Sequence, residues 1–326
     1  MTQDKRYMRD TLIEGIYHRM HEDDSIYFLS ADFGSPKLDQ LRATFKDRFV
    51  NVGIAEQNLI NVAAGLAFEG CTVFAYAIAS FITMRAFEQI RVNLALHAQI
   101  RPVNVNLIGV GSGVSYDVSG PTHHCLEDIS IMRTLPNMEV FSTSDCVLAS
   151  SFLDYAIEAK KPKYIRFDSK PLPDIYERMR SFRMSDCFEE LRPGSDVCLV
   201  ATGYMTHTAL KVAEVLKSRG ISAGIIDIFG LKPFAEDAFC EAVGKYRAIV
   251  TMEEAYIGKS GLDGLVGGIL HRRLPGIRTF GAGVRDTFVF ELGGRDHLHK
   301  LNGMDEESVA EAAVKLLEQS AASTGW

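Results

Sequence analysis

The chain has 326 residues, of which 47% are hydrophobic and 24% charged, and this is the composition of a folded protein rather than of a disordered or fibrous one. At roughly 100–200 residues per domain, the length favours two domains. The net charge of −7 gives no general attraction to nucleic acid or to a membrane surface, so both are poor partner candidates, and an anionic ligand would need locally placed basic groups.

The six cysteines are scattered along the chain without a Cys-x-x-Cys pair or a cluster of zinc spacing, and no secretory leader pattern precedes them. We therefore expect reduced cysteines that pack in the core, a cytoplasmic protein, and no metal site within this chain. The apolar stretches fall short of the ~18–20 residues that a membrane span needs, so no transmembrane segment is expected.

Helix-length and strand-length apolar patterns alternate through the first half of the chain. Between Tyr7 and Met20, apolar residues recur at spacings of three and four, which predicts an amphipathic helix. Strands are then expected at 25–30, 48–51, 71–77, 102–110, 139–141 and 163–166, and helices at 55–69, 81–96, 127–133 and 147–159. Because helices separate the strands, we expect a mostly parallel sheet that is covered on both faces.

A stretch rich in proline and charge interrupts this alternation after Asp168. We place a first domain at residues 1–168, a linker at 169–195 and a second domain at 196–326. In the second domain, strands are expected at 196–202, 222–228 and 248–253, and helices at 206–219, 235–243, 261–272 and 306–319. The predicted fold class is therefore α/β, with two open, mostly parallel sheets and helices on both faces of each.

Ligands of open α/β sheets bind beyond the carboxyl ends of the strands, so residues in those loops are the candidates for a site. Glu56 lies on the first turn of an apolar helix, where a glutamate gains about 0.3–1 kcal/mol from the helix dipole even without a catalytic role. Phe81 could stack on a flat ring or fill the core. The loop from Gly111 to His124 could form one wall of a site. Its adjacent histidines could carry protons, be solvated or bind metal, and metal is the weakest interpretation because adjacent rings rarely reach one ion.

Three further polar residues lie at the ends of expected elements: Arg9, Ser35 and Arg166. Each of them alone is most often a surface charge or a cap. Arginine, however, is suited to bidentate contact with phosphate, so the three form a candidate anion-binding group.

Several motifs resemble those of transketolases. The motifs similar to the pyrimidine-binding domain of that family are Gly-Ile-Ala-Glu-Gln-Asn at 53–58, Ala-Ala-Gly-Leu-Ala at 63–67, Arg-Ala-Phe-Glu-Gln-Ile-Arg at 85–91, Gly-Pro-Thr-His at 120–123, Leu-Pro-Asn at 135–137 and Thr-Ser-Asp at 143–145. The motifs similar to the transketolase C-terminal domain are Ala-Thr-Gly at 201–203 and Met-Glu-Glu at 252–254. The resemblance covers nearly the whole chain in the family's order.

This resemblance implies a thiamine diphosphate enzyme that transfers a two-carbon ketol unit from a ketose to an aldehyde. Transketolases bind the diphosphate and magnesium of the cofactor through a Gly-Asp-Gly motif, which does not occur in this sequence. The chain therefore resembles the C-terminal subunit of a split transketolase. Its implied partners are an N-terminal subunit that carries Gly-Asp-Gly and binds most of the cofactor and Mg²⁺, further copies in a heterotetramer, and small sugar substrates.

The matching positions imply roles at the cofactor. Glu56, which we expect to be exposed in the cleft, matches the glutamate that hydrogen-bonds N1′ of the aminopyrimidine and favours the tautomer that takes the thiazolium proton. Phe81 matches the aromatic residue that stacks on the pyrimidine, and other aromatic side chains of the preceding strand are alternatives. His123 matches a histidine that faces the substrate's oxygens. Asp32 matches an acidic residue near the thiazolium and the subunit interface.

The departures from the family pattern concern the substrate. The aspartate that usually precedes Gly-Pro-Thr-His and contacts the acceptor's 2-hydroxyl is Ser119 here, and a histidine near the distal phosphate is Gly111. Arg9, Ser35 and Arg166 match the other members of that phosphate clamp. The resemblance thus implies a phosphorylated or otherwise anionic sugar, with an acceptor that is bulkier or differently substituted than ribose 5-phosphate.

Two related enzymes and one non-enzyme remain as alternatives. They are the β subunit of a 2-oxo acid dehydrogenase, a 1-deoxyxylulose-5-phosphate synthase-like enzyme, and an inactive regulatory paralogue. Retention of Glu56, Phe81 and His123 argues against the inactive paralogue, because a scaffold would need none of them.

Overall fold

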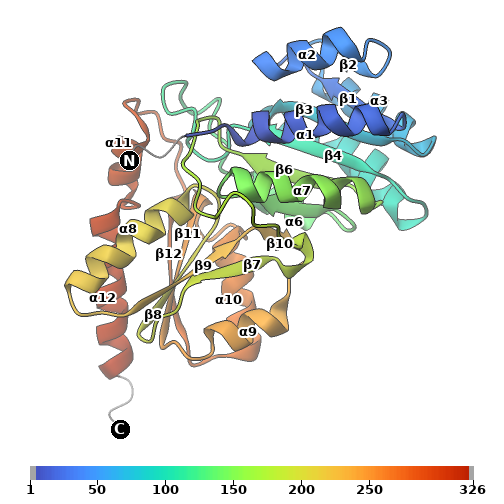
Figure 1. The fold of residues 1–326 in the computed structure, drawn as a ribbon. Helices are drawn as coiled ribbons and strands as arrows, with labels where there is room; N and C mark the ends of the chain where they lie inside the picture. Colours follow the sequence, from blue (N-terminus) through green and yellow to red (C-terminus); the bar gives the residue numbers. More distant parts are fainter. Residues whose placement is uncertain (1–4, 323–326) are drawn as a thin grey trace.

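Two mixed sheets organise the computed structural model, which describes residues 5–322 (Figure 1). The strands of the first sheet stand in the order β10–β5–β6–β4–β3–β1–β2. Their bounds are β1 (Ile26–Ser30), β2 (Phe49–Asn51), β3 (Thr72–Ile78), β4 (Val105–Val110), β5 (Glu139–Ser142), β6 (Lys163–Phe167) and β10 (Gly230–Lys232). Neighbours pair in parallel, except that β10 runs antiparallel to β5.

Helices cover both faces of this sheet. They are α1 (Met8–Glu22), α2 (Pro36–Thr44), α3 (Glu56–Phe68), α4 (Ala79–Met84), α5 (Phe87–Gln89), the π-helical η1 (Ile90–Leu96), the short η2 (His97–Gln99), α6 (Asp128–Thr134) and α7 (Cys146–Glu158). Successive strand residues point to opposite faces, so Phe74 and Tyr76 pack with α1 and α7, whereas Val73 and Ala75 pack with α3 and α6. The predicted apolar stripe of α1 is buried at Met8, Leu12, Ile13, Ile16 and Met20, whereas Tyr17 is partly exposed.

The prediction of one continuous helix at 81–96 is wrong, because α4, α5 and η1 divide that segment. Ala86, between α4 and α5, leaves helical geometry with φ −106° and ψ 17°. Within α4, the Thr83 hydroxyl donates to the Ala79 carbonyl at 2.7 Å. The short α4 keeps Phe81 and Arg85 one turn apart at its end, where the two side chains meet.

The second sheet has the strand order β12–β11–β8–β9–β7. Its strands are β7 (Phe188–Arg192), β8 (Val197–Ala201), β9 (Ala223–Ile228), β11 (Ala248–Tyr256) and β12 (Arg278–Val284), and only β7 pairs antiparallel. The helices of this unit are α8 (Met205–Ser218), α9 (Glu236–Val243), α10 (Leu262–Arg273), α11 (Arg295–Asn302) and α12 (Glu306–Ala322). α8 and α12 cover one face, and α9 and α10 cover the other (Figure 1). The predicted fold class is confirmed.

The two units share strands and core rather than meeting only through a linker. The predicted linker at 169–195 contains the 3-10 turn η3 (Met184–Asp186) and β7, which is the edge strand of the second sheet. In the other direction, β10 leaves the second unit and extends the first sheet. One apolar cluster runs from α3 and α6 to α9 and α10, so the units are packed as one body.

A buried carboxylate also joins the units. Asp227 at the end of β9 is fully buried and accepts hydrogen bonds from Ser144 of the first unit, from Tyr176 of the connecting segment and from Thr206 of α8. Hydrogen bonds of this kind are needed because a buried carboxylate without donors is costly.

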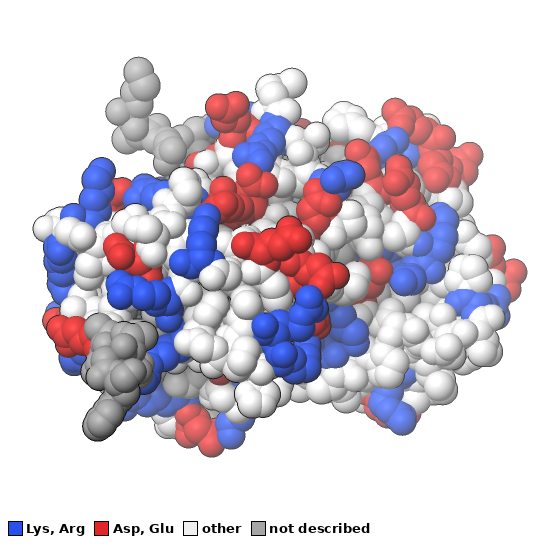
Figure 2. Space-filling model, turned by 90° about the horizontal axis from the view of Figure 1, so that it is seen from below, with Lys and Arg blue, Asp and Glu red and all other residues white. Residues whose placement is uncertain are grey.

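Two predictions made from composition concern a membrane span and the charge of the surface. Among residues 5–322, no helix is long and apolar enough to cross a bilayer. On the face shown in Figure 2, basic and acidic side chains are intermixed. That face therefore presents no broad area of one charge, and an anion would be recognised by local groups.

Asp227→Asn is expected to remove a pH dependence of folding stability. Burial raises the pKa of Asp227 from its ordinary value of 3.8 to about 6, although its hydroxyl donors oppose the rise. Because the folded state holds this proton more tightly than the unfolded chain, the contribution of Asp227 is most favourable below about pH 4 and is lost as the pH rises through 6. The free energy of unfolding of the wild type, relative to the variant, should therefore fall by about 2 kcal/mol from pH 4 to pH 7.

Urea unfolding at several pH values measures this difference. The exposed Asp237→Asn variant in α9 is the matched control, and it should show no such trend. A difference between wild type and Asp227→Asn that does not change with pH would contradict the prediction.

Candidate functional site

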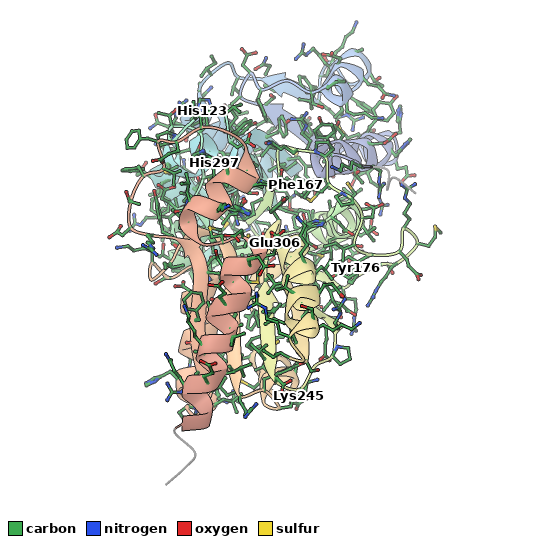
Figure 3. The ribbon with its side chains drawn as sticks, turned by 90° about the vertical axis from the view of Figure 1, so that its left-hand side faces the viewer. His123, Phe167, Tyr176, Lys245, His297 and Glu306 are labelled. Carbon is green, nitrogen blue, oxygen red and sulfur yellow. The ribbon has the colours of Figure 1, made fainter. Side chains whose placement is uncertain are left out.

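The first sheet positions most of the predicted site residues at one edge. β1, β2, β3 and β4 run parallel, so the loops that follow them leave from the same side of the sheet. Asp32 follows β1, Glu56 follows β2, Phe81 follows β3 and the loop 111–124 with His123 follows β4. In Figure 3, His123 lies at the upper end of the molecule, beyond the helices of the second unit.

Glu56 is buried, which corrects the expectation that it is exposed in the cleft. It is the first residue of α3 and is 6% exposed. Both of its carboxylate oxygens accept from Nη1 of Arg85, at 3.1 and 3.3 Å. The N-terminus of α3 has no side-chain cap, so the positive end of the helix dipole also favours the carboxylate.

A row of side-chain contacts connects Glu56 with the loop 111–124 by way of Arg85 and Phe81. Arg85 lies over Phe81, with Cζ 3.8 Å from the ring centroid. The His123 ring meets Phe81 at 5.4 Å and the Tyr116 ring at 5.9 Å, both in edge geometry. Of the aromatic candidates in this region, Phe74 is fully buried and Tyr76 likewise, whereas Phe81 is partly exposed. The geometry therefore favours Phe81 as the ring that is open to a ligand.

The two adjacent histidines have different surroundings. His123 is half-buried, and its Nδ1 lies 3.1 Å from the Thr122 hydroxyl. His124 is buried, its two ring nitrogens have no hydrogen-bond partner in the described part of the chain, and burial lowers its pKa. Of the pair, His123 is therefore the histidine that is accessible at this edge of the sheet.

Arg9 and Ser35 are brought together by Asp10. The Arg9 Nε lies 3.3 Å from Oδ1 of Asp10, and the Ser35 hydroxyl donates to the same oxygen at 2.7 Å. Ser35 is also the N-cap of α2 and accepts from the Lys37 backbone N–H at 3.3 Å. Asp10 thus partly neutralises the basic group that was expected to meet an anion.

Asp32 is exposed at the end of β1 with a positive φ of 53°. Its backbone N–H donates to the Asn51 side chain at 3.1 Å, and its carboxylate accepts from the Asn51 amide at 2.9 Å. This pair fixes the turn after β1 to the end of β2.

Arg166 does not join Arg9 and Ser35 in this structure. It is 3% exposed, and its Nε donates to Asp128 at 2.9 Å, while Tyr164 donates to the same carboxylate oxygen. Its Nη2 reaches the Cys125 carbonyl at 3.4 Å. Arg166 therefore supports the end of the loop 111–124 from inside the protein, and its guanidinium is engaged there.

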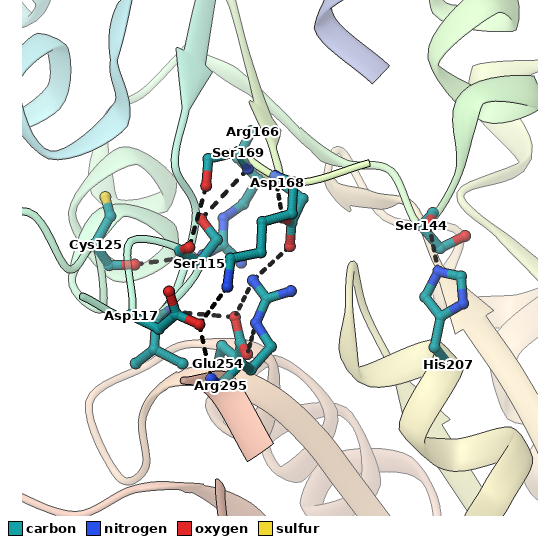
Figure 4. A network of polar contacts seen from close by, with 12 residues as sticks. Ser115, Asp117, Cys125, Ser144, Arg166, Asp168, Ser169, His207, Glu254 and Arg295 are labelled. Carbon is teal, nitrogen blue, oxygen red and sulfur yellow. Dashed lines mark hydrogen bonds and ion pairs between the residues drawn. The ribbon is translucent and has the colours of Figure 1, made fainter. Parts of the chain in front are cut away.

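The loop 111–124 is held by charges of the second unit (Figure 4). The Val114 N–H donates to Glu254 at 3.2 Å, and the Arg295 backbone N–H donates to Asp117 at 2.8 Å. The Arg295 guanidinium pairs with Asp168 and with Glu254, and Oε1 of Glu254 lies 3.0 Å from its Nε. Burial alone would raise the pKa of Glu254. The charge of Arg295 and a hydrogen bond with His299 of α11 outweigh this effect and lower the pKa to about 2.

The place beside Gly111 is filled by Tyr116, a residue that the sequence did not single out. Gly111 has φ +97°, and a Cβ added there would lie 2.0 Å from Cε2 of Tyr116. Tyr116 is half-buried, and burial raises its pKa while the nearby charge of Arg9 opposes the rise. Position 111, where the family pattern has a histidine, is therefore filled by the uncharged phenol ring of Tyr116 from the same loop. A tyrosine five residues after a loop glycine is the only sequence signal of this.

Comparison with known proteins assigns the chain to a family. Residues 4–173 match the transketolase pyrimidine binding domain, and residues 188–309 match the transketolase C-terminal domain. The chain is 31% identical over 317 residues to a 6-deoxy-6-sulfo-D-fructose transketolase subunit of Clostridium sp. (strain MSTE9), which covers 97% of this chain and 96% of the relative. It is 32% identical over 272 residues to an apulose-4-phosphate transketolase subunit of Actinobacillus succinogenes, covering 83% and 86%. A solved split-gene transketolase, described as an inactive beta4 tetramer, has a TM-score of 0.85 and 32% identity over 97% of this chain and 99% of its own.

These matches define a thiamine-dependent transferase subunit, and the chain belongs to the transketolase family. Within the family it corresponds to the C-terminal subunits of split transketolases. Against human transketolase it is 30% identical over 308 residues, which are 92% of this chain and 47% of the human protein. The 2-oxo acid dehydrogenase, deoxyxylulose phosphate synthase and inactive-paralogue alternatives are not favoured.

Gly111→Ala is expected to destabilise the chain by about 2–4 kcal/mol, because it adds backbone strain at a positive φ to a clash with Tyr116. The matched control is Gly258→Ala, since Gly258 has φ +73° but nothing within 4 Å of an added Cβ. The control should lose only the backbone part, about 1–2 kcal/mol. Adding Tyr116→Ala to Gly111→Ala should recover part of the loss. Urea unfolding of the wild type, the two single variants and the double variant measures these differences in the free energy of unfolding. Equal losses for Gly111→Ala and Gly258→Ala would show that Tyr116 does not fill this place.

Proposed function

We propose that this chain binds the aminopyrimidine half of thiamine diphosphate and, with an N-terminal partner subunit, transfers a two-carbon ketol unit from a ketose to an aldehyde. The observation that carries the proposal is the placement of a buried carboxylate, Glu56, beside a partly exposed aromatic ring, Phe81. Both lie at the carboxyl edge of the first sheet, next to the loop that contains His123.

The residues present fit a flat, hydrogen-bonding ring. The planar guanidinium of Arg85 stacks on Phe81 and donates to Glu56 at the same time. The cradle thus accepts a flat group with N–H donors in its plane, which is the character of an aminopyrimidine. When bound, thiamine diphosphate supplies the carbanion that attacks the ketose carbonyl.

The chain's own residues have distinct proposed roles around that group. Glu56 holds the proton at N1′ of the pyrimidine and so sets its tautomer, and Phe81 orients the ring by stacking. His123, half-buried at the edge of Phe81, donates to or accepts from the sugar's oxygens. Asp32, exposed at the end of β1, faces the partner side of the site.

The diphosphate and Mg²⁺ are proposed to bind mainly to the partner subunit with its Gly-Asp-Gly motif. Among residues 5–322, no group of three His, Cys, Asp or Glu side chains is arranged to hold a metal ion. We propose a heterotetramer in the cytoplasm as the working form.

We further propose that the substrates are ketoses and aldehydes with an anionic terminal group. Two relatives are named for 6-deoxy-6-sulfo-D-fructose and for apulose 4-phosphate, and both sugars end in an anion. The Arg9–Asp10–Ser35 cluster and the neutral Tyr116 support recognition of such a group.

The test of the reaction class is reconstitution with an N-terminal transketolase subunit of the same organism. We expect transfer from a ketose to an aldehyde only when both subunits, thiamine diphosphate and Mg²⁺ are present. Glu56→Gln should lower kcat of the saturated complex by about 100-fold or more, because it removes the proton-holding carboxylate. The matched control is Glu69→Gln at the exposed end of α3, which should keep full activity. Turnover by the isolated chain, or a fully active Glu56→Gln complex, would refute this function.

Ser119→Asp is expected to raise kcat/KM for ribose 5-phosphate as acceptor by about tenfold, because a carboxylate accepts a stronger hydrogen bond from the 2-hydroxyl than a serine does. Val118→Asp is the matched control, since it adds the same charge one position away on a side chain that is 71% exposed. Steady-state kinetics of both variants with ribose 5-phosphate and with a sulfonated or branched acceptor measures the change in acceptor preference. No gain for Ser119→Asp, or an equal gain for Val118→Asp, would contradict the expectation that the acceptor is bulkier or differently substituted than ribose 5-phosphate.

A further inference from the structure

One side chain covers both groups that the proposed function assigns to the cofactor. The Arg85 guanidinium lies 3.8 Å from the centroid of Phe81 and 3.1 Å from the Glu56 carboxylate. At 3.8 Å the stacking distance is filled, so no second planar group fits between Arg85 and this face of Phe81. The same nitrogen of Arg85 serves both Glu56 oxygens.

The chemistry of a guanidinium explains why it fits this place. A guanidinium is planar, stacks on aromatic faces and donates hydrogen bonds in its own plane. An aminopyrimidine that stacks on Phe81 and meets Glu56 would use the same face and the same carboxylate. The two groups therefore exclude each other.

The buried position of Glu56 requires a partner of this kind. Glu56 is 6% exposed, and a carboxylate at that depth without a partner is costly. The side chain of Arg85 is 48% exposed, so it supplies a counter-charge from the solvent side without being buried itself. Arg85 can leave toward solvent, whereas Glu56 cannot.

The backbone of Arg85 is held by two hydrogen bonds, and its side chain lies about half exposed at the surface. Its carbonyl accepts from the Gln57 amide at 3.2 Å, and its N–H donates to the Phe81 carbonyl at 3.1 Å. These contacts tie the end of α4 to the start of α3. A change of side-chain rotamer is then enough to open the site.

We propose that Arg85 is a placeholder for the aminopyrimidine of thiamine diphosphate, occupying the face of Phe81 and the carboxylate of Glu56 until the cofactor displaces it. The inference rests on the proposed function for the identity of the ring. Arg85 is a positioning residue in this account. It keeps Glu56 buried and correctly turned in the chain without cofactor, and it competes with the ring that Glu56 is to bind.

The first test measures binding rather than turnover. In the complex with the N-terminal subunit, Arg85→Ala should tighten binding of thiamine diphosphate with Mg²⁺ by about 3- to 30-fold, as measured by calorimetry, because the lost competitor made one stacking and one ion-pair contact. Arg85→Lys, which keeps the charge but cannot stack as a plane, should fall between wild type and Arg85→Ala. The matched control is Arg91→Ala, an exposed arginine of η1 in the same segment, which should bind as the wild type does.

The second test uses the isolated chain. Arg85→Ala should lower the midpoint of thermal unfolding at pH 7, because Glu56 is then buried without a counter-charge, and adding Glu56→Gln should restore most of the loss. Arg91→Ala should leave the midpoint unchanged.

The outcomes separate this inference from the proposed function. Unchanged or weaker cofactor binding by Arg85→Ala, in a complex whose wild type binds thiamine diphosphate, would overturn the placeholder and leave the proposed function standing. Absence of thiamine diphosphate binding by the wild-type complex would overturn both. An Arg85→Ala chain that is as stable as the wild type would also overturn the placeholder, because Glu56 would then need no cover.

Discussion

The ion pairs of Arg295 with Glu254 and Asp168 are the constraint on which the rest of the site depends. All three side chains are at most 5% exposed, and burying charges at this depth costs several kcal/mol per ion unless they are paired. Each carboxylate comes from a different unit, so the pairing is satisfied only when the units are packed as they are here. The packing of the two units and the neutralisation of these buried charges therefore depend on each other.

The loop 111–124 inherits its shape from this arrangement. The Glu254 carboxylate accepts a hydrogen bond from the Val114 N–H, and the Arg295 backbone N–H donates to Asp117. Residues on both sides of Tyr116 are therefore fixed by the second unit. Gly113 must be a glycine here, because a Cβ would lie 2.1 Å from Glu254. The second unit thus acts on this edge of the first sheet through the backbone of the loop 111–124.

The sequence was sufficient for features that depend on local pattern. The 3.6-residue period located α1, the alternation of strands and helices predicted parallel sheets, and the position of Glu56 at the start of α3 followed from an apolar helix after a strand. Features that depend on contacts between distant segments could not be read in the same way. β10 has three residues and joins the sheet of the other unit, and the interior position of Arg166 follows from Asp128, 38 residues away.

The same limit applies to the predicted substrate clamp. The resemblance to transketolases placed Arg166 with Arg9 in a phosphate clamp, and arginine is a residue type suited to that role. The structure shows that Asp128, at 0% exposure, requires a counter-charge, and Arg166 is that charge. Tyr116 was overlooked for the opposite reason. Its importance comes from its ring, which fills the place where a side chain of residue 111 would lie, and no periodicity or motif in the sequence records such a contact.

These two findings change the charge that a sugar's terminal group would meet. Arg9 remains as the basic member, and its Nε is 3.3 Å from Asp10. Tyr116 adds a donor without charge. A phosphate monoester carries about −1.5 to −2 charges at neutral pH, so one half-neutralised guanidinium compensates it poorly, whereas a sulfonate, with a single negative charge, is matched far better. Under the proposed function, the Gly111–Tyr116 pair and the interior position of Arg166 leave less positive charge for a sugar's terminal group than the predicted clamp of Arg9, Ser35 and Arg166 would supply.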